Sequence, residues 1–390
     1  MSPRQGVVIL DDIFPNLATG FRIAEFNWLM QRDAVSHVLT TQPLLETLPL
    51  YVAQYPELAD RVRPYSPDAL QGASLAWMTF LNNAAHFLND LEATDTPFVV
   101  TLYPGGGLNL GTPEADDKLA AVLASPLLQS VITTQPFVTE HVRAIAPHVV
   151  VDEIYGVVVS PTYLGPGAGF RDDYYAGSNV GSGTLRLCFA AHKYTPRGED
   201  KGYDIFIDAV RGLRAEGIPV EAHVIGGFTE DDIDVTDLGE CLTFHGELTT
   251  RDLKSAFSTM DLVLSPNRPR VLEPNAFDGF PLGSVIEAAL CGAGIVATDA
   301  LAQNRLFMDG RNILIVQPSA DDIVHRIAEL IAAPGGIKRL AQAGLAVARH
   351  GYGVNGQLWS RLNVMETALA MSDAASGQMT NGIRALRSGG

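Results

Sequence analysis

The feature that most constrains the fold is an alternation, along most of the chain, of short apolar runs with longer segments whose apolar residues recur every three or four positions. A bounded apolar run of about four to eight residues is typical of a strand buried on both faces, whereas the longer period is typical of an amphipathic helix. Strands that alternate with helices form parallel sheets with helices on both faces. The sequence therefore predicts an α/β fold of doubly wound parallel sheets.

The alternation occurs twice. In the first half, strands are predicted over 6–10, 98–103, 130–134 and 148–159, and helices over 23–35 and 74–91. In the second half, strands are predicted over 185–191, 220–227, 242–246, 261–266, 294–299 and 312–316. A stretch rich in Gly, Ser and Asp separates the halves and has no period, which is typical of a linker.

The length agrees with two domains, because 390 residues exceed the usual size of one domain, about 150 residues. We therefore predict a first domain, a linker, a second domain, a closing helical segment that returns to the first domain, and a flexible tail. Their predicted ranges are 1–165, 166–184, 185–350, 351–373 and 374–390.

Charge and cysteine content exclude several classes of protein. The 44 acidic and 27 basic residues leave a net charge of −17, which disfavours binding to nucleic acid. The three cysteines, Cys188, Cys241 and Cys291, are far apart and form no metal-binding spacing, as expected in a reduced cytoplasm. The sequence contains neither a signal peptide nor a transmembrane run, so we expect a cytoplasmic protein; contact with a membrane surface stays open.

The segment 277–299 carries the most informative chemistry. Asp278, Gly279, Phe280 and Pro281 precede a helix that begins with small residues and places Glu287 in its early turns. A helix N-terminus at the carboxyl end of a strand binds phosphate, and two carboxylates beside it can accept hydrogen bonds from sugar hydroxyls. The alternative is that Ser284 is a helix N-cap and that both acids are merely solvated.

A second segment, 185–204, supports the first interpretation. A buried-type strand ends near Lys193, and Lys201-Gly202 opens the next helix, with Arg197 in the loop between. Three basic residues gathered at one junction of an acidic protein suit a pyrophosphate. Solvated surface residues are the alternative.

These two segments resemble the retaining glycosyltransferases of family 4, whose GT-B architecture has two Rossmann-like domains facing a central cleft. The resemblance covers most of 185–350. In that family an Arg ends the strand and a Lys-Gly opens the next helix; Lys193 stands at the Arg position, and Lys201-Gly202 at the second. The family's Glu-Gly-Phe-Gly/Pro motif, with a second Glu downstream, is similar to 278–281 followed by Glu287. The resemblance implies transfer of a sugar from a UDP- or GDP-sugar to an acceptor hydroxyl with retention of configuration.

The resemblance also implies roles for single residues. Lys193 and Lys201 would bind the donor's diphosphate, Asp278 the transferred sugar, and Glu287 the ribose hydroxyls. Asn267 and Arg268 are expected near the diphosphate, and His245 near the base, although a packed histidine at a strand end fits equally well. The residues expected to bind the donor are Thr19, Gly20, Tyr103, Gly105, Arg197, His245, Gly246, Gly279, Phe280, Pro281, Leu282, Gly283 and Ser284.

Two departures from the family pattern concern the acids. Asp278 replaces the more frequent Glu and is one methylene shorter. The spacing from Asp278 to Glu287 is one residue longer than is usual in the family. We therefore expect a bulge over 282–284, which affects the contacts to the donor sugar.

The first half offers two loops that could approach a ligand. Thr19 and Gly20 precede a helix predicted to start near Phe21, and a plain turn fits this Gly as well as a phosphate contact does. Tyr103 is followed by Pro104 and three glycines, 105–107, at the end of a strand. Relatives often have a His near the position of Tyr103, so its hydroxyl could contact the sugar; the loop could also serve the acceptor or be only a flexible turn.

No cofactor and no metal are expected, because Asp231-Asp232 and Asp321-Asp322 suit a loop and a helix start rather than a metal motif.

A non-catalytic subunit that binds a sugar nucleotide is an alternative function, favoured by the Lys and Asp replacements. A sugar-nucleotide epimerase or a glycogen-phosphorylase-like enzyme would share the architecture, but the residues these need are not visible. A doubly wound oxidoreductase lacks its GxGxxG after the first strand. The acceptor cannot be read from the sequence: a glycan, a lipid-linked glycan, a protein or a small molecule all fit.

Overall fold

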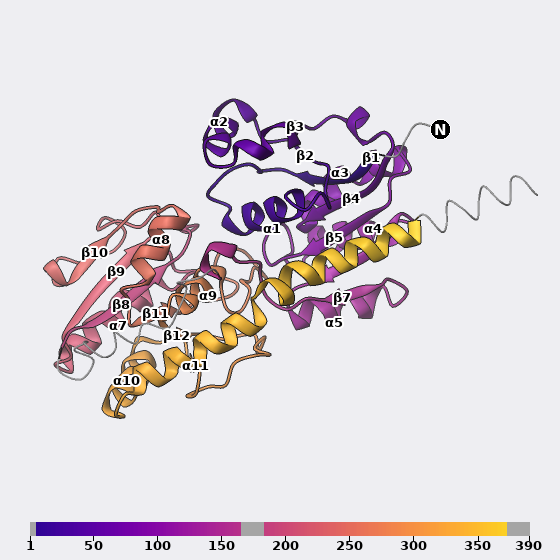
Figure 1. The fold of residues 1–390 in the computed structure, drawn as a ribbon. Helices are drawn as coiled ribbons and strands as arrows, with labels where there is room; N and C mark the ends of the chain where they lie inside the picture. The colour runs from indigo at the N-terminus through magenta and orange to yellow at the C-terminus, as the bar shows by residue number, and fades with distance from the viewer. Residues whose placement is uncertain (1–4, 165–182, 373–390) are drawn as a thin grey trace, which may run out of the picture. The chain divides into compact units, whose positions relative to one another are not determined.

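The computed structural model describes residues 5–164 and 183–372. They form two compact α/β units. The first contains the residues up to Tyr155 and those from Asn355 onward, and the second contains Gly156–Val354. Each unit has its own sheet and is described by itself (Figure 1).

The first unit is built on a seven-stranded parallel sheet with the order β3-β2-β1-β4-β5-β6-β7. Its strands are β1 (Gln5–Asp11), β2 (His37–Thr40), β3 (Val62–Pro64), β4 (Ala73–Thr79), β5 (Phe98–Leu102), β6 (Leu128–Thr133) and β7 (Val151–Glu153). The connecting helices are α1 (Gly20–Met30), α2 (Leu44–Gln54), α3 (Leu81–Ala93), α4 (Pro113–Ala124) and α5 (Pro136–Ile145). Short 3₁₀ turns, η1 (Pro56–Arg61) and η2 (Pro67–Leu70), flank β3.

The single helix predicted over 74–91 is wrong, because this segment contains β4 followed directly by α3. β4 lies between β1 and β5 and is buried on both faces, so its apolar run does not alternate. Because this apolar run is followed directly by the three-to-four-residue apolar spacing of α3, the two elements together have the sequence pattern of one long helix. Phe80 separates the two elements, with a φ of 73° that no helix contains.

The chain returns to the first unit at its end. A π-helical turn over Asn355–Trp359 leads into a helix over 360–372, which lies beside β7 in Figure 1. Trp359 packs edge-on against Trp28 of α1, with ring centroids 5.2 Å apart. The fully buried Arg361 binds to residues of the first unit, as described below.

The second unit contains a six-stranded parallel sheet with the order β10-β9-β8-β11-β12-β13. Its strands are β8 (Leu185–Ala190), β9 (Val220–Ile225), β10 (Leu242–Phe244), β11 (Leu262–Ser265), β12 (Gly294–Ala297) and β13 (Leu314–Ile315). Its helices are α7 (Tyr203–Ala215), α8 (Thr250–Phe257), α9 (Gly283–Leu290), α10 (Ala320–Ala332) and α11 (Gly336–Gly351), with short turns η3 (Pro161–Tyr163) and η4 (Gly239–Cys241).

Two apolar clusters cover the two faces of this second sheet. On one face, α7 presents Phe206, Val210 and Leu213, spaced by four and three residues, toward the strands. On the other face, α9 and α11 contribute Val285 and Leu345 among others. The two-domain, Rossmann-like α/β architecture predicted from the alternation is confirmed.

The predicted linker and tail lie almost wholly outside the described residues, which stop at 164, resume at 183 and end at 372. The described residues 156–164, which we assigned to the first domain from the sequence, group with the second unit.

Candidate functional site

The second sheet has a topological switch point between β8 and β11. These strands are neighbours, but β8 continues to β9 on one side and β11 to β12 on the other. Open α/β sheets bind ligands outside the carboxyl ends of their strands at such a point. The loops that follow β8, β11 and β12 carry the two motifs singled out in the sequence.

Lys201 and Asp278, 77 positions apart in the sequence, meet at this point. The ammonium of Lys201 lies 2.6 Å from Oδ1 of Asp278 and 3.6 Å from Oδ2 of Asp200, and only 7% of the lysine side chain is exposed. Gly202 follows with a φ of 72°, and a Cβ there would lie 2.1 Å from the carbonyl oxygen of Pro266. A glycine is therefore required where the loop after β8 packs against the loop after β11.

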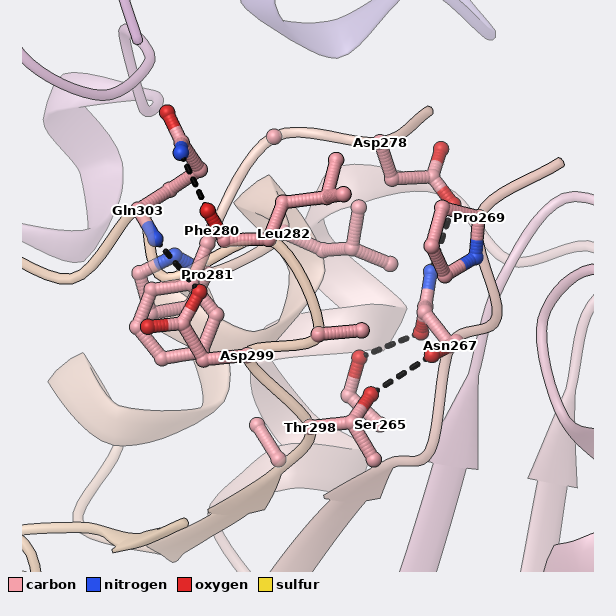
Figure 2. Close-up of a pocket in the computed structure, with 14 residues that line it drawn as sticks. Ser265, Asn267, Pro269, Asp278, Phe280, Pro281, Leu282, Thr298, Asp299 and Gln303 are labelled. Carbon is pink, nitrogen blue, oxygen red and sulfur yellow. Dashed lines mark hydrogen bonds between the residues drawn. The ribbon is translucent and has the colours of Figure 1, made fainter. Parts of the chain in front are cut away.

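Asn267 holds the other side of Asp278. Its Nδ2 donates to Oδ2 of Asp278 over 2.6 Å. Ser265 donates to the Asn267 side-chain oxygen over 2.7 Å, and Thr298 donates to the Asn267 carbonyl over 2.6 Å (Figure 2). Oδ1 of Asp278 is thus held from the loop after β8, and Oδ2 from the ends of β11 and β12. The sequence placed Asn267 near a diphosphate, and the structure makes it a partner of the first acid.

Arg268, also expected near a diphosphate, is engaged elsewhere. Its guanidinium makes a bidentate contact with Asp204 at the start of α7, at 2.8 and 2.9 Å, and donates to the carbonyl of Glu199 at 2.9 Å. It therefore ties the loop after β11 to the loop after β8.

Lys193 and Arg197 do not join Lys201 directly. Lys193 donates to Asp232 over 2.5 Å, and Asp232 also accepts from the backbone N–H of Thr229. From the sequence, we interpreted Asp232 as an ordinary loop acid. Its pairing with Lys193 was missed because an ion pair between two distant loops leaves no local sequence pattern. Arg197 is mostly exposed, and its Nε lies 3.9 Å from Glu199.

The loop over 279–282 and the start of α9 form one wall of a pocket. Gly279, Phe280, Pro281 and Leu282 line it together with Asp278, Asn267, Thr298 and Asp299 (Figure 2). α9 begins at Gly283, with Leu282 as N-cap, so Ser284 is not the cap residue. Instead, its hydroxyl donates to the carbonyl of Ala190, which places the N-terminus of α9 at the end of β8. Helix N-terminal N–H groups without an intrahelical acceptor attract anions.

Glu287 lies further along α9, where its side chain is half-buried. Burial raises the pKa of its carboxyl to about 8, and a hydrogen bond from the Tyr163 hydroxyl lowers this pKa only in part. Tyr163 is fully buried, and its hydroxyl oxygen lies 3.3 Å from the carbonyl oxygen of Thr250. Sequence reasoning missed Tyr163, because no motif links a residue before the linker to α9.

His245 and Gly246 follow β10, at the same edge of the sheet. His245 Nε2 lies 3.0 Å from Nδ1 of His223, so this histidine has a ring partner within the unit. Burial lowers the pKa of His223, and the neighbouring His245 lowers it further. Gly246 has a φ of 65° and accepts a hydrogen bond from the N–H of Gly226.

Thr19 and Gly20 lie at the start of α1 in the first unit. The Thr19 hydroxyl donates to the carbonyl of Asn16 over 2.7 Å rather than capping the helix. A Cβ at Gly20 would meet nothing within 4 Å, so open space adjoins this position.

Tyr103 is buried, and its hydroxyl is engaged. The hydroxyl donates to Glu25 over 3.2 Å and accepts from Arg361 over 2.8 Å, and 4% of the residue is exposed. In this arrangement the hydroxyl stabilises a buried ion pair. Gly105 is exposed, whereas Gly106 and Gly107 pack so closely on Phe80 and Asn82 that a Cβ would overlap them.

Two features are absent from the residues that the structure describes. Across 5–164 and 183–372, no group of three or more His, Cys, Asp or Glu side chains is arranged to hold a metal ion. No helix in these ranges combines the length and the apolar character needed to cross a membrane.

Comparison with known proteins agrees with this geometry. Residues 186–333 match the family profile described as Glycosyl transferases group 1. The comparison with curated proteins found no match. Among solved structures, the Anabaena protein Alr3699/HepE in complex with UDP and glucose has a TM-score of 0.63 at 17% identity, covering 93% of this chain and 100% of that one.

Two further solved structures are similar over nearly their whole length. The sucrose-phosphate synthase of Thermosynechococcus elongatus has a TM-score of 0.61 at 14% identity, covering 97% of this chain and 100% of that one. A glycosyltransferase from Rickettsia africae has a TM-score of 0.66 at 11% identity, covering 95% and 99%. The chain therefore has the two-domain, Rossmann-like GT-B fold, and its residues 186–333 match the profile of the Glycosyl transferases group 1 family.

Proposed function

We propose that the protein is a retaining glycosyltransferase, which transfers a sugar from a UDP- or GDP-sugar to an acceptor hydroxyl. The observation that carries the proposal is the Lys201–Asp278–Asn267 group at the switch point of the second sheet, beside the N-terminus of α9. A buried cation next to a helix N-terminus suits a diphosphate, and an oriented carboxylate suits sugar hydroxyls. The HepE structure that shares this fold contains UDP and glucose.

In this proposal, Lys201, Lys193 and the first N–H groups of α9 stabilise charge on the leaving diphosphate. The bond between the anomeric carbon and the phosphate oxygen breaks, and a bond from that carbon to the acceptor oxygen forms. The acceptor proton moves to a phosphate oxygen on the same face of the sugar, so retention needs no separate base. Preorganised positive groups of this kind lower the barrier by stabilising the developing charge.

Asp278 and Glu287 have different tasks in the same proposal. Asp278, held by Lys201 and Asn267, accepts hydrogen bonds from the transferred sugar. Glu287 binds the ribose hydroxyls, with Tyr163 orienting its carboxyl. His245 and Gly246 lie toward the base, and 279–284 surround the sugar and the diphosphate. The remaining expected donor contacts, from Arg197 and from Thr19, Gly20, Tyr103 and Gly105 in the first unit, stay predictions.

The test is release of nucleoside diphosphate from a panel of UDP- and GDP-sugars, with product stereochemistry read by NMR. We expect turnover of at least one donor, retention, and a loss of about a hundredfold in Lys201→Ala. Lys338→Ala, on α11 away from the site, is the matched control and should behave as wild type. Consumption of no donor, or inversion, would contradict the proposal. Donor binding without turnover would favour the non-catalytic subunit instead.

A further inference from the structure

The first unit has a switch point of its own, between β1 and β4. These strands are neighbours, while β1 continues to β2 on one side and β4 to β5 on the other. By the same rule that locates the donor site, this is where an open sheet receives a ligand. The carboxyl ends of the two strands carry a polar group of four residues, Asp11, Asp12, Arg22 and Asn83, to which the proposed function gives no role.

Asp11 is the buried anchor of this group. It ends β1 and is fully buried, and its carboxylate accepts hydrogen bonds from the N–H groups of Ile13 and Phe14 at 2.9 and 2.8 Å. Arg22 of α1 places Nε 3.0 Å from its second oxygen. Burial raises the pKa of Asp11, and Arg22 opposes this rise. Such a carboxylate fixes the position of Arg22.

The anchor in turn orients Asp12, which is half exposed. Arg22 Nη2 lies 3.2 Å from Oδ1 of Asp12, and Asn83 Nδ2 donates to the same oxygen over 3.1 Å. Arg22 and Asn83 are themselves 7% and 3% exposed, so their side chains are held by packing. Oδ2 of Asp12 has no hydrogen-bond partner among the residues that the structure describes, and 51% of the side chain is exposed. One carboxylate oxygen is thus fixed while the other stays available.

Two aromatic rings adjoin the guanidinium of Arg22. Phe21 and Phe80 are half-buried, their ring centroids lie 5.8 Å apart at 76°, and the guanidinium of Arg22 lies 4.7 Å from the Phe80 ring centre. Phe80 has a φ of 73°, which is unfavourable for a residue with a Cβ and is found most often where a site needs it. Arg22 thus contacts both the oriented carboxylate and two partly exposed rings, and this combination matches a sugar, which has apolar C–H faces and donates hydroxyl hydrogens.

The charge of the group selects among sugars. The Arg22 guanidinium lies within 3.2 Å of both acids, so its charge is already balanced by carboxyl groups. A phosphate group brought to this point would be repelled by Asp12 and would find Arg22 already paired. We propose that Asp12, oriented by Arg22 and Asn83, binds an uncharged sugar as the acceptor, together with the Phe21 and Phe80 rings that adjoin Arg22. This inference rests on the proposed glycosyltransferase activity.

The experiment compares acceptors on the full chain, with a donor that it consumes. Methyl hexosides and neutral disaccharides should stimulate release of nucleoside diphosphate above hydrolysis, and the corresponding hexose 6-phosphates should not. Asp12→Asn should raise the acceptor KM about tenfold, the effect of losing a charged hydrogen-bond acceptor, and leave the donor KM unchanged. Glu140→Gln, an exposed acid on α5 of the same unit, is the matched control.

Saturation-transfer NMR with the same neutral sugars gives a readout without turnover, so failure of this inference and failure of the glycosyltransferase proposal are distinguishable. We expect a signal with the wild type and with Glu140→Gln, and its loss with Asp12→Asn. The inference is overturned if a hexose 6-phosphate or an amino sugar is preferred to its neutral parent. It is equally overturned if no neutral sugar binds or stimulates, or if Asp12→Asn matches the wild type.

Discussion

At the scale of single residues, the two lysines in and near the loop after β8 are both paired with carboxylates. Lys201 lies against Asp278 and Lys193 against Asp232, at 2.6 and 2.5 Å. A diphosphate that enters this place replaces or shares these partners, so its binding reorganises charge that is already balanced. The sequence predicted Lys201 and Asp278 as parts of one site. It did not predict Asp232, because ion pairing between distant loops leaves no local pattern.

Burial moves the pKa of the Glu287 carboxyl into the physiological pH range, so its protonation changes near neutral pH. Its pKa in the folded protein is about 8, above the ordinary 4.5, so the unfolded chain loses this proton first as pH rises. Glu287 therefore destabilises the fold progressively between these values, with no further change above them.

Glu287→Gln removes this destabilisation and keeps a side chain that can hydrogen-bond Tyr163. Relative to wild type, the variant should gain up to about 4 kcal/mol of unfolding free energy between about pH 5 and pH 8.5. Urea denaturation of both proteins at the two pH values measures it. If the difference in unfolding free energy between variant and wild type were the same at both pH values, Glu287 would already be ionised in the folded protein.

At the scale of elements, the start of α7 depends on close packing between two loops. Gly202 has a φ of 72° and would place a Cβ 2.1 Å from the Pro266 carbonyl oxygen, whereas Gly217, just after α7, has a φ of 77° with nothing within 4 Å. The two positions therefore separate the cost of the backbone angle from the cost of the overlap.

Gly217→Ala should cost about 1 kcal/mol of stability, the effect of the backbone angle alone. Gly202→Ala should cost at least about 2 kcal/mol more, and should weaken nucleotide binding because it displaces Lys201. Thermal unfolding and nucleotide titration of the two variants check this. Equal losses would show that the loop after β11 moves freely away.

The C-terminal helix over 360–372 is tied to the first unit by a buried ion pair. Arg361 lies 3.6 Å from Glu25 and donates to Tyr103 over 2.8 Å, and both charged residues are fully buried. Burial raises the pKa of Glu25, and Arg361 opposes that rise. Removing the arginine leaves a buried carboxylate without its counter-charge.

Arg361→Ala should therefore lower the free energy of unfolding by about 3–5 kcal/mol. Arg63→Ala, at an exposed arginine of the same unit, should change it by less than about 1 kcal/mol. Urea denaturation of both variants compares them. A small effect of Arg361→Ala would mean that the closing helix contributes little to the first unit.

At the scale of the whole molecule, the sequence alone was enough to predict the class of fold, because the alternation of strand and helix periods is local and repeated. It misjudged β4, whose apolar run merges with α3, and it overlooked β2 and β3, which are only four and three residues long. It could not show that Tyr103 is buried, because its partner Arg361 is 258 positions away. Lys201 and Asp278, taken from two separate motifs, lie together in the structure, while their other partners could be identified only from the structure.

The charged groups at the two switch points differ, although the chain as a whole is acidic. The net charge of −17 opposes extended polyanions, yet the second unit places buried Lys201 beside a helix N-terminus, whereas the arginine at the first unit's switch point is already paired with two carboxyl groups. We infer that the two switch points differ in the charge of the ligand each receives: a diphosphate in the second unit and an uncharged sugar in the first.

The most direct test of this account is calorimetric titration of UDP and GDP into the wild-type protein and Lys201→Ala, with Lys338→Ala as control. The account predicts that one of the two nucleotides binds to the wild type and the control, and that Lys201→Ala weakens this binding by about tenfold or more. Absence of binding by both nucleotides, or equal affinity in Lys201→Ala, would contradict the assignment of the donor site.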